Sequence, residues 1–206
     1  MSTSSTASAG TLGTTVKLSA MMFLQFFLWG AWFVTLGPFL NSRGADPSTI
    51  GNAYTSAPVG AILAPVFLGM IADRFFATQI VLGVLHVLGG LLLMVAPSVA
   101  PGSEGGNTGL FLGVLYAHML CYMPTLGLTN TLAFHNMTNP EKQFPPVRVL
   151  GTIGWIVAGF AVASVMKHYA GEGAAGNVVE GRAEFFYVAG AAGVLLGLYS
   201  FFLPHT

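Results

Sequence analysis

Charged residues are scarce in this chain. Only seven lysines and arginines and seven aspartates and glutamates occur among 206 residues, whereas about a quarter of the residues in a typical soluble domain are charged. Hydrophobic residues make up 54% of the chain, and its mean hydropathy is +0.73. A soluble fold could not hide that much apolar surface, so the composition predicts an integral membrane protein.

Other features are missing as well. The single cysteine, Cys121, excludes an intramolecular disulfide. A formal net charge of zero without a basic cluster argues against nucleic acid as a partner. The sequence has no H-E-x-x-H motif, no glycine-flanked serine elbow with a histidine at hand, and no metal-ligand spacing among its histidines. We therefore expect neither an enzyme nor a protein with a metal or cofactor.

The apolar residues form six long uncharged blocks. Each is long enough for the roughly 20 residues that a helix needs to cross about 30 Å of hydrocarbon. Their continuous apolarity argues against a β-barrel, whose strands alternate apolar and polar residues. The sequence thus predicts an all-α membrane protein with six transmembrane helices, at about residues 18–40, 48–72, 76–97, 108–135, 145–167 and 184–203.

The first residues have a different composition. Residues 1–16 are rich in Ser, Thr, Gly and Ala and carry no charge, which predicts a disordered tail before a transmembrane domain of residues 17–206. A cleaved signal peptide is the weaker alternative, because Trp29 and Trp32 stand where small residues would be needed.

Arg148 is a permanent charge at the head of the fifth predicted span. Thr152 and Trp155 follow it at i+4 and i+7, so a cation, a hydroxyl and an indole share one helix face. Charge inside a membrane segment usually marks function, and this face is a candidate binding surface. The alternative is that Arg148 snorkels to the interface, since Pro145 and Pro146 suit a first helical turn.

A second wall of this surface is expected on the first span. Gln25 and Trp29 are spaced i, i+4 there, and an intramembrane glutamine beside an aromatic ring suits a polar cavity. Helix–helix hydrogen bonding by Gln25 and packing by Trp29 are the alternatives.

No aspartate or glutamate lies inside a predicted span, so no carboxylate in the sequence is placed for proton coupling. His86, His118 and His135 lie within spans, but a lone intramembrane histidine is more often a hydrogen-bonded structural residue.

The end of the second span carries a recognisable motif. Gly69, Asp73 and Arg74 form a G-x-x-x-D-R arrangement that resembles the loop signature of the major facilitator superfamily, which implies a gating loop. The basic residues that usually follow are replaced by Phe75, Phe76 and Ala77 in this sequence.

Three longer runs sharpen the resemblance. They cover residues 23–32, 122–131 and 144–154, and they look like the nucleoside:proton symporter family within that superfamily. The resemblance implies proton-coupled nucleoside uptake by alternating access, with the substrate on Arg148, Thr152 and Trp155. It also implies that the chain is the N-terminal half of a twelve-helix protein, built of 3+3 inverted repeats.

On this reading the protein lies in the lipid bilayer of a bacterial inner membrane with its N-terminus cytoplasmic. Its partners are a nucleoside, a proton and a missing C-terminal six-helix half that carries the coupling carboxylate. The alternative is a complete six-helix scaffold, or a self-pairing half-transporter for another small polar solute.

Overall fold

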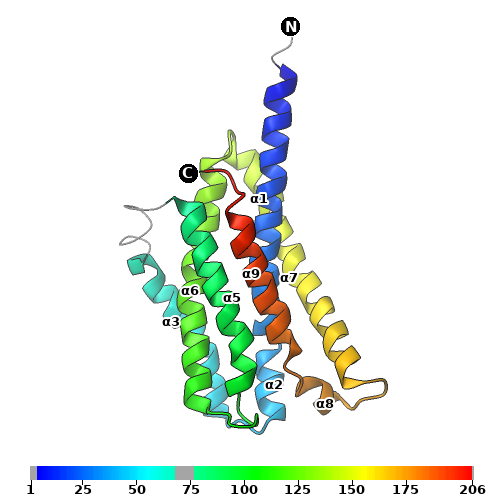
Figure 1. The fold of residues 1–206 in the computed structure, drawn as a ribbon. Coiled ribbons are helices and arrows are strands. Elements are labelled where there is room, and N and C mark those ends of the chain that lie inside the picture. Colours follow the sequence, from blue (N-terminus) through cyan, green and yellow to red (C-terminus); the bar gives the residue numbers. More distant parts are fainter. Residues whose placement is uncertain (1–3, 68–76, 206) are drawn as a thin grey trace.

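The computed structural model describes residues 4–67 and 77–205. The long helices run side by side as a bundle (Figure 1). The helices are α1 (Ser4–Phe33), α2 (Leu36–Ser42), α3 (Pro47–Phe67), α5 (Thr78–Val99), α6 (Thr108–His135), α7 (Pro140–Ala170), α8 (Gly176–Glu180) and α9 (Glu184–Ser200). The predicted gating residues Gly69, Asp73 and Arg74 lie outside the described residues.

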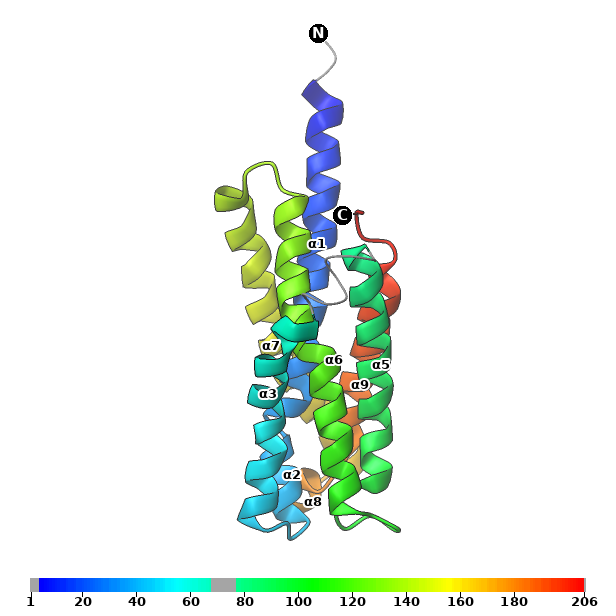
Figure 2. The ribbon, with the colours of Figure 1, turned by 90° about the vertical axis from the view of Figure 1, so that its left-hand side faces the viewer.

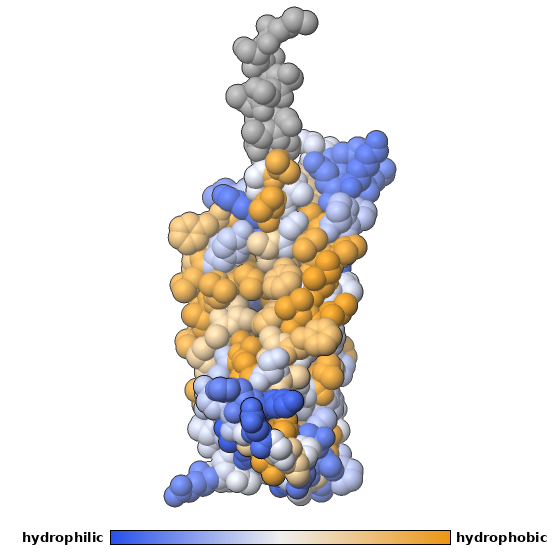
Figure 3. Space-filling model, turned by 90° about the vertical axis from the view of Figure 1, so that its right-hand side faces the viewer, coloured by the Kyte–Doolittle hydropathy of each residue, from blue (hydrophilic) through white to orange (hydrophobic). Residues whose placement is uncertain are grey.

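Five segments of the described chain are long and apolar enough to cross a membrane. They are Leu12–Ser42, Thr78–Val99, Thr108–His135, Pro140–Ala170 and Gly176–Ser200. Figure 3 shows the corresponding surface, an apolar band between two hydrophilic ends. The chain is therefore a multi-pass membrane protein.

The second predicted span, residues 48–72, is not among these five segments. Its described part is α3, 21 residues long, whose first half is rich in Ser, Thr and Asn. α3 nevertheless lies within the bundle and packs along α6 (Figure 2). Polar side chains lower the hydropathy of this described part without preventing a helix, and residues 68–72 of the predicted span lie outside the described residues.

The start of α7 differs from the expectation. The sequence predicts a helix from residue 145, but α7 begins at Pro140, with Asn139 as N-cap accepting a hydrogen bond from the Lys142 N–H at 3.3 Å. A proline at the first helical position and an asparagine cap are a strong start signal. Pro145 and Pro146 consequently lie inside the helix, and Arg148 is two turns from its start.

The N-terminal residues also differ. Where the sequence predicts a disordered tail up to residue 16, α1 begins at Ser4, and it projects beyond the other helices in Figure 1. Extending an existing helix needs no new nucleus, which is the costly step of helix formation. Near this end Tyr199 Oη donates to the Lys17 carbonyl at 3.2 Å, and Lys17 Nζ donates to the Phe202 carbonyl at 3.3 Å.

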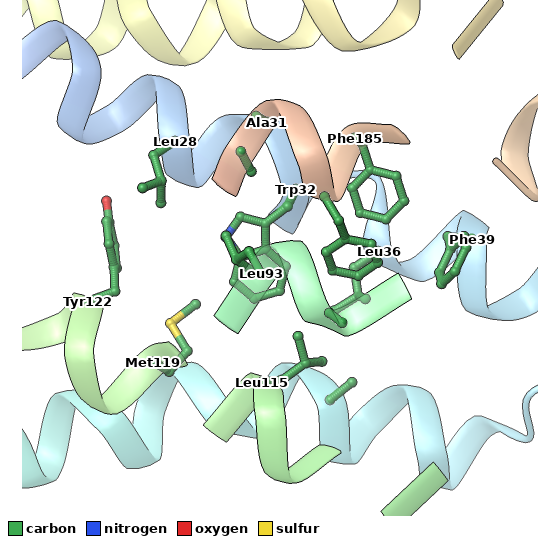
Figure 4. Close-up of a cluster of buried hydrophobic side chains, with 14 of the residues drawn as sticks. Leu28, Ala31, Trp32, Leu36, Phe39, Leu93, Leu115, Met119, Tyr122 and Phe185 are labelled. Atoms are coloured by element: carbon green, nitrogen blue, oxygen red, sulfur yellow. The ribbon is translucent and has the colours of Figure 1, made fainter. Parts of the chain in front are cut away.

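Large side chains fill the bundle around Trp32, toward the end opposite the N-terminus (Figure 4). Phe185 and Phe186 of α9 pack there with Phe39 of α2, all fully buried. Glycines bring the helices close enough for this packing: a Cβ on Gly90 of α5 would lie 2.7 Å from the Gly190 carbonyl oxygen of α9. Small residues at helix contacts are the usual means of packing within a membrane.

Candidate functional site

The crossing of α1 and α7 positions the candidate site. A Cβ on Gly154 would lie 2.2 Å from the Phe23 carbonyl oxygen, and one on Gly30 would lie 3.0 Å from the Trp155 carbonyl oxygen. Only hydrogen at these positions permits so close a backbone approach. The two helices therefore hold their facing side chains in direct contact along this stretch.

Arg148 lies on the exposed flank of this crossing. Its guanidinium carbon is 4.0 Å from the centroid of the Phe26 ring of α1, a cation–π contact. Gly151 makes room for it, because a Cβ there would lie 2.6 Å from Phe26 Cδ2 and 2.9 Å from Arg148 Nη1. Thr152, one turn further on, is exposed on the same face. The Phe26 ring thus holds one face of the Arg148 guanidinium, while the N–H groups along its edge remain exposed.

Aromatic rings continue the surface beyond Arg148. Trp155 of α7 meets Trp29 of α1 edge to face, with ring centroids 5.4 Å apart and planes at 86°. Trp29 also contacts Phe26 at 6.4 Å and Tyr122 of α6 at 5.7 Å. The Trp29 Nε1–H has no hydrogen-bond partner among the described residues. We call Phe26, Trp29, Arg148, Thr152 and Trp155 the aromatic site.

Gln25 lies behind this surface and does not open onto it. The residue is fully buried, and its Nε2 donates to Thr125 Oγ1 at 2.8 Å. Its Oε1 is 2.7 Å from His86 Nε2, which must carry the hydrogen for this pair to form. Tyr122 Oη donates to the Gln25 backbone carbonyl at 2.8 Å. These bonds join α1, α5 and α6. Gln25 therefore holds the part of α1 that carries Trp29 against α5 and α6.

The other buried histidine of the core is His118. Its Nδ1 is 2.9 Å from the Gly89 carbonyl and therefore donates, while its Nε2 has no partner among the described residues. It lies edge to face with Trp32, at a centroid distance of 5.2 Å. His86 and His118 are both buried away from the aromatic site, in contacts between helices.

Carboxylates of the described chain lie at helix ends and in connections. Asp46, which precedes α3, accepts hydrogen bonds from the side chains and backbone N–H groups of Ser48 and Thr49. These bonds hold the pKa of the Asp46 carboxyl well below its usual value. No group of three potential metal ligands occurs among residues 4–67 and 77–205.

Two residues of this arrangement were not expected from the sequence as parts of a site. Phe26 was not singled out, although it lies three residues before Trp29 and therefore on a neighbouring position of the same helix face. Tyr122 joins α6 to α1 through its hydrogen bond to the Gln25 carbonyl, and its ring also packs against Trp29.

The chain matches known proteins over nearly its whole length. The profile of the family described as "Nucleoside H+ symporter" matches residues 12–206. The putative nucleoside transporter YegT of Escherichia coli (strain K12) is 40% identical over 94% of this chain and 43% of its own length. The nucleoside permease NupG and the xanthosine permease of the same organism are 31% and 30% identical, over 92% of this chain and 42% of theirs.

The fold agrees with these matches. The crystal structure of the nucleoside transporter NupG superposes with a TM-score of 0.81 and 29% identity, covering 94% of this chain and 44% of that one. The chain thus spans less than half the length of the relatives it matches. Sequence and structure together place the chain in the nucleoside H+ symporter family.

Proposed function

We propose that this chain is the N-terminal six-helix part of a proton-coupled nucleoside transporter that works by alternating access. Its coverage of less than half of YegT and NupG supports a second part of similar size. In this proposal α3 is the second of six crossings in a 3+3 inverted repeat. The protein lies in the inner membrane, with the N-terminus cytoplasmic and the end of α7 outside.

The observation that carries the proposal is the exposed aromatic site with a cation at one end. A nucleoside joins a planar base to a sugar with several hydroxyls, and the site offers matching chemistry. Stacking of a base on an indole contributes about 1–3 kcal/mol and accepts different bases. The Arg148 guanidinium and the Thr152 hydroxyl are donors for base carbonyl or ribose oxygens.

The Trp29 N–H is a buried donor without a partner among the described residues, directly behind the exposed surface of the site. A buried donor without an acceptor costs about 1–3 kcal/mol, and a substrate oxygen that reached it would recover part of that cost. Gln25 contributes indirectly in this proposal, by holding α1 against α5 and α6. The second half closes over the exposed flank and supplies the titratable carboxylate, because carboxylates of the described chain lie only at helix ends and in connections.

Uptake by the natural gene product that contains residues 1–206 tests the proposal. We expect radiolabelled uridine or adenosine to enter proteoliposomes under an inward proton gradient, and a protonophore to reduce that uptake. Arg148→Ala should weaken nucleoside binding by about tenfold or more, the usual consequence of losing hydrogen bonds from a charged group. Arg148→Lys should recover only part, since an ammonium lacks the planar fork.

Arg182→Ala is the matched control. Arg182 is an arginine in the connection before α9, where it pairs with Glu184 away from the aromatic site. We expect uptake by this variant to equal that of the wild type. Proton-driven uptake by residues 1–206 alone, or full binding by Arg148→Ala, would contradict the proposal.

A further inference from the structure

A hollow lies at the far end of α7, beyond the aromatic site. Its volume is about 690 Å³, and it is open on one side between the α1–α2 junction, α7 and the connection that contains α8. Binding sites for small molecules commonly have volumes of about 300–1,000 Å³ and mainly apolar walls. We call this hollow the outer cavity.

The outer cavity continues the aromatic site along the same face of α7. Gly159, which lines it, follows Trp155 at i+4, and Ala163 follows at the next turn. With a rise of about 1.5 Å per residue, the cavity begins about 6 Å beyond Trp155 along the helix axis. On the opposite wall Trp29 contacts Phe33 at 5.6 Å, directly before the lining residue Val34. The outer cavity therefore follows the aromatic site along the contact between α1 and α7.

The groups that line the outer cavity are unlike those of a surface that only faces lipid. Apart from Thr35, its walls are apolar side chains and glycines, while Lys167 and Glu180 bring an ammonium and a carboxylate to its rim. The structure gives neither charge an ion-pair partner within the described residues; Arg182, nearby in sequence, is already paired with Glu184. A ligand for this cavity needs an apolar plane together with hydrogen-bonding donors and acceptors.

We propose that the outer cavity is a second, external nucleoside site from which the aromatic site is loaded. This inference rests on the proposed function. The base packs on the apolar wall at Gly159 and Val162, two ribose hydroxyls donate to the Glu180 carboxylate, and Lys167 donates to a base carbonyl. The site accepts a neutral, hydroxylated heterocycle and gives no advantage to an anion, because its two charges are opposite in sign.

Gly159 offers a direct way to fill the outer cavity. A Cβ at this position would meet no other atom within 4 Å, so Gly159→Leu occupies the space without displacing protein. Gly113 of α6 has equally open surroundings, lies inside a helix, and does not line the cavity. Gly113→Leu is therefore a matched control for added bulk and helix propensity.

The experiment measures the concentration dependence of proton-driven uridine uptake by the full gene product in proteoliposomes. We expect Gly159→Leu to raise KM about tenfold, which corresponds to about 1.4 kcal/mol. Glu180→Gln should raise it about threefold, because glutamine keeps one acceptor oxygen and loses one of the two exposed hydroxyl contacts. kcat should stay within about twofold of the wild type in both, and Gly113→Leu should match the wild type.

Three other outcomes would each overturn a different claim. Absence of uridine and adenosine uptake by the wild type would refute the proposed function, and the outer site with it. Uptake with an unchanged KM in both cavity variants would refute the outer site alone. A lower kcat at unchanged KM would show that protein, and not substrate, fills the cavity during the cycle. Should Gly159→Leu fail to fold, as judged by size-exclusion chromatography, Glu180→Gln and Lys167→Gln decide in its place.

Discussion

Gly154→Ala perturbs the α1–α7 crossing at its closest point. The new Cβ would lie 2.2 Å from the Phe23 carbonyl oxygen, 3.0 Å from its carbonyl carbon and 3.1 Å from its Cα. All three are backbone atoms, so no side-chain rotation relieves the overlap. Since ordinary contacts of this kind are near 3.5 Å, α7 must move from α1 by roughly 1 Å.

The expected change in the free energy of unfolding combines two opposing effects. Overpacking of a well-packed contact costs about 1–3 kcal/mol, while replacing glycine by alanine inside a helix returns up to about 1 kcal/mol. Gly159→Ala, on the same helix, has the second effect without the first, because its Cβ would meet no atom within 4 Å. The free energies of unfolding of these two variants should therefore differ by about 1–3 kcal/mol, with Gly154→Ala the less stable.

Thermal unfolding in detergent, followed by circular dichroism, measures this difference. For a chain of about 200 residues, each kcal/mol shifts Tm by about 2–4 °C. The same displacement should loosen the contact of Arg148 with Phe26, because Gly151 lies less than one turn before Gly154. Nucleoside binding by the full gene product should therefore weaken as well. Equal Tm values for Gly154→Ala and Gly159→Ala would refute the close crossing on which the aromatic site depends.

Two further predictions concern the polar contacts. Gln25→Leu keeps the side-chain volume but leaves Thr125 and His86 without their partner, and should lower the free energy of unfolding by about 1–3 kcal/mol; an unchanged Tm would mean that the buried bonds do not form. Asp46→Asn should speed hydrogen exchange at the start of α3 at pH 7. Because the folded pKa of Asp46 is depressed, its contribution is complete above the unfolded value of about 3.9 and is lost as the pH falls through the folded pKa. The difference between wild type and variant should therefore shrink below about pH 4, and a difference that grew there would contradict this assignment.

Several features of this protein follow from the sequence because they depend on neighbours along the chain. Scarce charge and continuous apolar blocks predict a helical membrane protein, and the structure has α6 at Thr108–His135, the range expected from the sequence. The motifs around Trp29, Tyr122 and Arg148 indicate the family that the comparisons show. Helical periodicity alone places Arg148, Thr152 and Trp155 on one face of α7.

Other features are decided only by which helices pack together. Pro145 and Pro146 are compatible with a helix start, but the Asn139 cap and Pro140 begin α7 earlier and carry Arg148 two turns inward. Gln25 has the same chemistry whether it faces a cavity or the core, and the positions of α5 and α6 bury it against His86 and Thr125. The contact between the Phe26 ring and the Arg148 guanidinium joins residues more than 100 positions apart in the sequence, and so does the lining of the outer cavity. Such contacts depend on the distances between helix axes, which glycines such as Gly154 set, and no local pattern in the sequence encodes them.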